Sequence, residues 1–138
     1  TGGPQVDERG QTSVPGIFSC GNVLQVHDIV DNVSLEAEYI VEGVVEYLKG
    51  KLTKEQEIKV ELGNGLRYVV PQTLIRVKDT IFSFRVNQPG RKKILLFEDG
   101  RRLIKKKSLQ RVNPAEMIRI KLSSSELEEV KMLKVKLV

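Results

Sequence analysis

Hydrophobic residues recur along this chain with two different periods, and the change falls near residue 50. Before it, apolar residues lie three or four positions apart, as on one face of a helix: Ala37, Val41, Val44 and Leu48. We expect this helix to begin between Asn32 and Ser34, where a short polar side chain can cap it, and to end at Lys49-Gly50. Glu36 and Glu38 suit its positive N-terminal end.

A short apolar run stands before this helix. Pro15-Gly16 introduces the run, which covers residues 17–20 (Ile-Phe-Ser-Cys), and Gly21-Asn22 follows it. Turn residues on both sides of four mainly apolar residues predict a buried strand. The order expected for residues 1–50 is therefore strand, glycine turn, loop and helix.

After residue 50, apolar residues alternate with others, which is typical of strands. The clearest alternations are Ile58, Val60 and Leu62; Phe82, Phe84 and Val86; and Ile118, Ile120 and Leu122. Asp99-Gly100, between two β-prone runs, predicts a hairpin with a two-residue turn. Turn residues recur at strand-like intervals, so we expect seven or eight strands, a mainly β fold and an antiparallel β-sandwich.

The charge changes sign where the period changes. Residues 1–50 hold two basic and eight acidic side chains, a net charge of −6, whereas residues 51–138 hold 21 and 10, a net charge of +11. Such a change indicates a domain boundary. We therefore predict one unit over 1–50 and a β-sandwich over 51–138, joined by the polar stretch LKGKLTKEQE. Opposite net charges also favour docking between the two parts.

The composition excludes several classes of function. A single cysteine cannot form an internal disulfide or a dithiol redox pair, and one cysteine with one histidine makes a poor set of transition-metal ligands. We expect no metal site. The chain has no apolar run of the roughly 18 residues that span a membrane and no signal-like leader, so a cytoplasmic location is expected. Because it opens without methionine, we expect it to be cut from a longer protein.

The first 50 residues resemble a known family. GGPQVDERGQTSVPGIFSCGNV is similar to the second FAD-binding motif of the pyridine nucleotide-disulfide oxidoreductases, which include thioredoxin reductases and NADH oxidases. That motif consists of a threonine, a short apolar strand and Gly-Asp, which match Thr12, residues 17–20 and Gly21-Asn22. The following VHDIVDNVSLEAEYIVEGVVEYL is similar to the closing helix of the family's FAD domain.

The resemblance implies roles for three residues. Gly21 would let the backbone approach the cofactor closely, since a glycine has no Cβ to clash. Asn22 stands where the family usually has aspartate, and it would bond a ribityl hydroxyl through its amide oxygen. Val33 would donate its backbone N–H to the flavin ring from the positive end of the helix. FAD is thus the cofactor implied for the parent protein.

The chain lacks the family's other cofactor motifs. A GxGxxG unit for the FAD pyrophosphate and an NAD(P)-binding unit are both absent from the sequence. We therefore expect this chain to be the inactive C-terminal part of an oxidoreductase that passes electrons from NAD(P)H through FAD to an acceptor, and not to bind FAD alone. Residues 17–20 would then pair with another chain, pack on the β half or be poorly ordered. The alternative is a stand-alone β-sandwich that binds a protein and has no redox role.

The remaining signals concern packing and partners. His27 could act as an acid or base oriented by Asp28 or Asp31, but a packing role is favoured, as it is for Cys20. Basic clusters lie at 91–93, 101–102 and 105–107. Few aromatic residues accompany them, so nucleic acid is disfavoured. The partners expected are the FAD and NAD(P) domains of the parent, for which the β domain provides contact, and an acidic subunit or a second copy.

Overall fold

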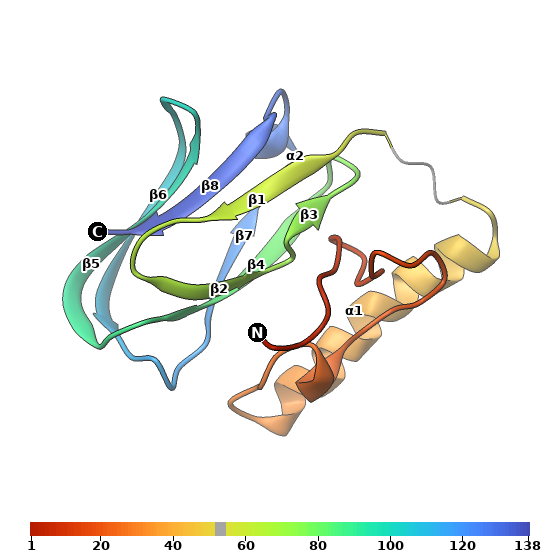
Figure 1. Ribbon diagram of the computed structural model, residues 1–138, viewed down its shortest axis with the longest axis horizontal. Helices are drawn as coiled ribbons and strands as arrows, with labels where there is room; N and C mark the ends of the chain where they lie inside the picture. The colour runs from red at the N-terminus through yellow and green to blue at the C-terminus, as the bar shows by residue number, and fades with distance from the viewer. Residues whose placement is uncertain (52–54) are drawn as a thin grey trace.

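The computed structural model describes residues 1–51 and 55–138 (Figure 1). Residues 52–54, within the stretch predicted as a linker, lie outside the described residues. Two β-sheets face each other and a long helix lies beside them. The prediction of a mainly β fold is confirmed.

Eight strands form the two sheets. Three strands form one sheet in the order β2-β4-β7, and five form the other in the order β3-β1-β8-β5-β6. Every neighbouring pair is antiparallel except β1 and β8, which run parallel. The strands are β1 Ile58–Leu62, β2 Leu66–Val70, β3 Thr73–Leu74, β4 Thr80–Val86, β5 Gly90–Asp99, β6 Arg102–Val112, β7 Ile118–Leu122 and β8 Met132–Leu137.

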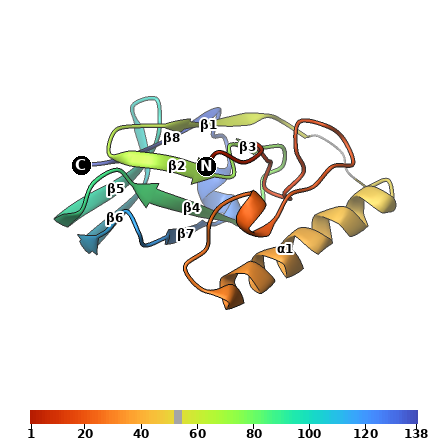
Figure 2. The same cartoon turned by 60° about the horizontal axis from the view of Figure 1, so that its bottom comes forward.

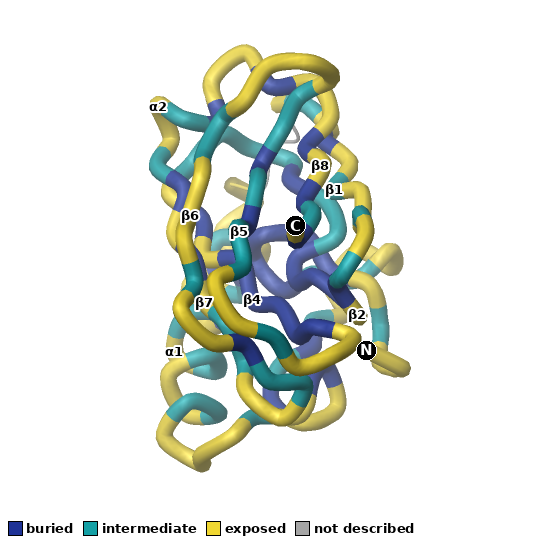
Figure 3. The backbone as a smooth tube through the Cα atoms, turned by 90° about the vertical axis from the view of Figure 1, so that its left-hand side faces the viewer, coloured by how far each residue is buried: buried dark blue, intermediate teal, exposed yellow. Residues whose placement is uncertain are grey.

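The two sheets share one hydrophobic core. Phe82 and Phe84 from β4 pack edge-on against Phe97 from β5, with ring centroids 5.9 and 5.7 Å apart, and none of the three is exposed to solvent. Buried residues gather between the sheets, whereas β6 at the sheet edge is largely exposed (Figure 3). The alternation predicted for residues 82–86 therefore marks the centre of the sandwich. A short helix, α2 (Ser124–Leu127), closes one end, and Ser123 caps it.

The predicted hairpin joins β5 to β6, but its turn lies one residue later than expected. Asp99 pairs with Arg102, so the two loop residues are Gly100 and Arg101. Gly100 has a φ of +60° and stands first in the loop, as a type II′ turn requires.

The long helix α1 covers Val30–Leu48, beginning earlier than its predicted cap at Asn32 to Ser34. Its buried residues are Ile40 and Gly43, with Tyr39 and Val44 packed beside them. Val41 and Leu48, expected on the buried face, are 55 % and 77 % exposed. The N-terminal loop packs so closely on the face containing Gly43 that a Cβ there would lie 2.7 Å from Arg9, so only glycine allows this approach.

The strand expected over residues 17–20 does not form. Phe18 makes only one isolated β-bridge, with Gln11, and no element of either sheet runs alongside it. Residues near the N-terminus instead lie between α1 and the sheets (Figure 2). Val6, Leu24 and Ile40 share a second apolar cluster with Tyr68 and Val70 of β2. Phe18 and Cys20 pack against this cluster, in agreement with the expectation that the segment packs on the β half, and the Phe18 ring also contacts Tyr47 of α1.

Candidate functional site

Gly21, Asn22 and Val33 lie together beside the first turns of α1. Gly21 opens a 3₁₀ turn, η1 (Gly21–Val23), with a φ of +68°, a conformation that favours glycine. A Cβ built on Gly21 would lie 3.2 Å from Cγ1 of Val33, so the turn packs closely on the helix. Asn22 is exposed. The structure thus brings together the three residues that the resemblance singles out.

The start of α1 changes what Val33 offers to a ligand. Because the helix begins at Val30, Val33 is its fourth residue. The N–H groups without an intrahelical partner belong to the first turn, so the positive end of the helix lies at Val30 and Asp31. Val30 and the preceding Ile29 are 75 % and 58 % exposed. The positive helix end is therefore bordered by exposed apolar side chains.

Glu36 organises the turn, a role that the sequence did not indicate. Its Oε2 accepts the backbone N–H of Gly21 at 2.7 Å and lies 3.0 Å from Nε2 of His27. Its Oε1 accepts Nε2 of Gln25 at 2.6 Å. Sequence reasoning assigned Glu36 only to the helix dipole, because its partners in residues 21–27 are set by the turn. The N–H of Gly21 is consequently already paired.

His27 packs between the helix and the sheet. Its side chain is 1 % exposed, with Nε2 toward Glu36 and Nδ1 3.3 Å from Nη2 of Arg119 on β7. Its backbone N–H donates to Oδ1 of Asn22 at 3.2 Å. Among the described residues, neither Asp28 nor Asp31 bonds the ring. These contacts support the packing role over an acid–base role.

Arg85 of β4 anchors the loop before α1 to the β part. It donates to Asp28 Oδ1, to the carbonyl of Val26 at 2.9 Å and to the hydroxyl of Tyr68 at 3.1 Å. Burial acts to lower the pKa of Arg85, but the bonds to Asp28 and Tyr68 outweigh it, so that pKa is raised. Burial likewise acts to raise the pKa of Asp28, but the N–H of Met117 and the guanidinium lower it overall. The ion pair between Arg85 and Asp28 thus joins the loop before α1 to strand β4.

A second charged group lies beneath the N-terminal loop. Arg9, 1 % exposed, pairs with Asp7 at 3.2 Å, and Arg76 pairs with Glu46 of α1 at 2.6 Å. Glu8 lies between the two guanidinium groups and accepts the N–H of Ile75 at 2.8 Å. Burial is the largest cause that raises the pKa of Glu8. These contacts join the loop, α1 and the β part.

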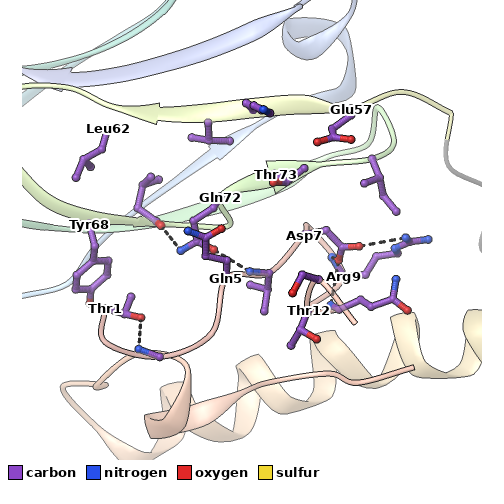
Figure 4. Close-up of a pocket in the computed structure, with 18 of the residues that line it drawn as sticks. Thr1, Gln5, Asp7, Arg9, Thr12, Glu57, Leu62, Tyr68, Gln72 and Thr73 are labelled. Atoms are coloured by element: carbon purple, nitrogen blue, oxygen red, sulfur yellow. Dashed lines mark hydrogen bonds and ion pairs between the residues drawn. The ribbon is translucent and has the colours of Figure 1, made fainter. Parts of the chain in front are cut away.

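Two hollows flank the N-terminal loop. A cleft of about 1120 Å³ lies between residues 1–15 and strands β1 to β3 (Figure 4). Its charged lining residues include Asp7 and Arg9, which pair with each other. Gln72 also lines the cleft, and its side-chain oxygen accepts the N–H of Val6 at 2.9 Å. A smaller cavity of about 320 Å³ lies between the loop, α1 and the three-stranded sheet, and is lined mainly by apolar residues.

The basic clusters lie on the β5–β6 hairpin. Arg102 and Lys105 form ion pairs with Glu129 and Glu126. Within the described residues, the other seven basic side chains of the hairpin form no ion pair: Arg91, Lys92, Lys93, Arg101, Lys106, Lys107 and Arg111. Because β6 is the last strand of its sheet, these charges surround an open edge.

The described residues contain no group of three or more His, Cys, Asp or Glu side chains that could hold a metal ion. No described helix is long and apolar enough to cross a membrane. Comparison of the chain with protein-family models, with curated proteins and with solved structures found no match.

Proposed function

We propose that this chain is part of a cytoplasmic FAD- and NAD(P)-dependent oxidoreductase similar to the pyridine nucleotide-disulfide oxidoreductases, and that it supplies one wall of the flavin site. FAD would supply hydride and electron transfer from NAD(P)H to an acceptor. The observation that carries the proposal is the close packing of the left-handed Gly21 turn on Val33 beside the exposed Asn22. The residues that would hold the rest of the nucleotide belong to the parent protein.

The turn has the chemistry to contact a ribityl chain. Gly21 presents no side chain, and its N–H is held by Glu36, so the turn keeps its shape without a ligand. The amide oxygen of Asn22 accepts one N–H from His27 and has a second lone pair for a hydroxyl. The start of α1 at Val30 would direct its positive end toward an electron-rich ring oxygen, with Val33 one turn further along.

Exposed apolar side chains support a partner on this side of the molecule. Of the sixteen large hydrophobic residues that are exposed within the described ranges, eleven lie between residues 14 and 48. Val23, Ile29 and Val30, next to the turn, are 58–75 % exposed. Exposed apolar side chains that border a candidate site favour a partner there. The occupant that fits the motif is the rest of the FAD domain of the same protein.

The test is flavin retention by the protein expressed from its full reading frame. We expect that protein to be yellow, and Asn22→Ala to lower the FAD retained per chain after gel filtration. Asn64→Ala is the matched control, because Asn64 is also an exposed turn asparagine but lies between β1 and β2. A full-length protein that stays colourless after reconstitution with FAD would overturn the proposal, as would equal retention by the two variants.

The β part serves as a contact domain in this proposal. The seven unpaired basic side chains of the hairpin, next to the open edge of β6, favour an acidic partner subunit or an acidic face of a second copy. The same surface supports the alternative function, a stand-alone β-sandwich that binds a protein without redox chemistry. Flavin content separates the two functions.

The contact role has its own measurement. Light scattering of the full-length protein, alone and with the subunits that co-purify with it, would report the mass of the assembly at low and high salt. We expect Lys106→Glu with Lys107→Glu to dissociate it at low salt, and Lys49→Glu with Lys51→Glu, outside the hairpin, to leave it intact. An unchanged mass in the hairpin variant would contradict the contact role.

A further inference from the structure

The cavity between α1 and the three-stranded sheet is built as a site for a small molecule. Its volume of about 320 Å³ is roughly twice that of an engineered apolar cavity, about 150 Å³, that takes up benzene. The apolar wall comes from three parts of the chain: Leu24 directly after the turn, Leu35 and Ile40 from α1, and Val70, the adjoining Pro71 and Ile81 from the side of the sheet. The volume is therefore sufficient for a ring-sized molecule.

Three polar atoms without partners belong to residues that line this cavity. They are Oε1 of Gln25, the hydroxyl of Tyr39 and Oε1 of Glu8, and none has a hydrogen-bond partner among the described residues. Gln25 and Glu8 are 3 % and 2 % exposed, so solvent does not replace the missing partners. Buried polar atoms are almost always paired in folded proteins. Three unpaired atoms around one hollow indicate that a bound molecule completes them.

The orientation of these groups limits the chemistry of that molecule. The Nε2 of Gln25 is committed to Glu36 at 2.6 Å, so its free atom is the acceptor oxygen. Glu8 Oε1 is also an acceptor, and it lies 4.0 Å from Nε of both Arg9 and Arg76. The other charged side chains of the lining already have protein partners. Asp7 pairs with Arg9, Glu36 accepts a hydrogen bond from Gln25, and Arg119 donates one to Asn32. Acceptors in an apolar wall suit an uncharged ligand with an N–H or O–H donor.

We infer that this cavity binds a small, uncharged, mainly apolar ring molecule that donates a hydrogen bond to Gln25, with Tyr39 and Glu8 as further partners. The inference does not depend on the flavin proposal, because the cavity lies behind the turn, on the sheet side of α1. Recognition rests on the donor, since a site with a buried unpaired acceptor rejects an analogue that leaves this acceptor unpaired.

Indole and benzofuran are suitable probes, because they have the same shape and only indole carries an N–H donor. Calorimetric titration of the 138-residue chain is expected to give saturable binding of indole at least tenfold tighter than that of benzofuran. Gln25→Leu should reduce the preference to less than threefold, and Tyr39→Phe, which removes only the hydroxyl, should weaken indole binding while the protein stays folded.

Two helix variants locate the binding. Leu35→Trp adds bulk at the cavity wall and should weaken both probes at least tenfold, whereas Val41→Trp, equally exposed on the same helix but outside the wall, should leave them unchanged. Equal affinity of the two probes, no saturation, or undiminished binding by Leu35→Trp would overturn the inference. So would loss of indole binding in the full-length protein, which would show that the rest of that protein fills the cavity.

Discussion

Arg85 offers the sharpest test of how the loop before α1 is held. Its guanidinium, with a side chain 10 % exposed, donates to Asp28, Tyr68 and the carbonyls of Val26 and Pro114. Arg85→Met keeps much of the side-chain length and removes all of these bonds. The change leaves Oδ1 of Asp28 and two carbonyls without this donor, while Oδ2 of Asp28 keeps the N–H of Met117 at 2.8 Å.

The expected loss follows from the burial of Arg85, whose side chain is 10 % exposed. Removing one partner of a buried ion pair destabilises a protein by about 3–5 kcal/mol. The side chain of Asp28 is 33 % exposed, so water can replace part of the lost interaction. We therefore expect Arg85→Met to lower the free energy of unfolding by about 3 kcal/mol, at the lower end of that range. Arg85→Lys keeps the charge but not the planar set of donors, and should lose about half as much.

The assay is guanidinium unfolding followed by circular dichroism. An unchanged slope of the free energy of unfolding against denaturant concentration shows that the substitution changes stability alone. Arg67→Met, an exposed arginine on the neighbouring strand β2, is the control and should change stability by less than about 0.5 kcal/mol. A loss below about 1 kcal/mol for Arg85→Met, or wild-type stability for Arg85→Lys, would refute the reasoning that this network fixes the loop.

Three further outcomes are expected. Gly43→Ala should destabilise the chain by about 1–2 kcal/mol in thermal melts, because the added Cβ would lie 2.7 Å from Arg9. Ser34→Ala, at an exposed position of the same helix, is the control and should gain up to about 1 kcal/mol of stability from the higher helix propensity of alanine. The same gain for Gly43→Ala would contradict the close packing at Gly43. Glu36→Ala should speed hydrogen exchange at the amide of Gly21, which loses its 2.7 Å acceptor, and unchanged exchange would exclude that bond. The folded-state pKa of Asp28 lies below its ordinary value of 3.8, so the ionised carboxylate stabilises the fold above about pH 4, and this stabilisation is lost as pH falls through the folded-state pKa. Asp28→Asn should therefore make the free energy of unfolding depend less on pH on the acid side. An unchanged pH dependence there would contradict the lowered pKa.

Three strands were predictable because their apolar residues alternate with other residues, which is the period of a strand. Residues 58–62, 82–86 and 118–122 alternate apolar and other side chains, and all three segments lie in strands of the sandwich. The parallel pairing of β1 with β8 was not predictable, since these strands are far apart in sequence and their order depends on packing. The capping box of Ser123 and Glu126 was visible as a Ser-x-x-Glu pattern, and it starts the short helix α2.

The first 50 residues show where sequence periodicity misleads. The apolar positions of α1 include Val41 and Leu48, yet the buried face is the one that carries Gly43, because the buried loop around Arg9 needs that space. The strand expected over residues 17–20 lacks a neighbouring strand and makes a single bridge. The periodicity of a helix shows which of its faces is apolar, but not which face the rest of the chain packs against.

The candidate site was predictable only in part. The residues named from the resemblance, Gly21, Asn22 and Val33, lie together beside the first turns of α1. Glu36, which fixes the turn through Gly21 and His27, was not predicted to do so, because its role depends on how the loop folds back on the helix. The cavity beside Gln25 depends on three segments brought together only in the folded chain.

The most direct test of the account is anaerobic reduction of the protein expressed from its full reading frame, followed in the visible absorption of bound flavin. We expect oxidised-flavin absorption that NAD(P)H bleaches, with less flavin retained by Asn22→Ala than by Asn64→Ala. A protein without flavin absorption after reconstitution with FAD, or with a flavin that neither NADH nor NADPH reduces, would contradict it.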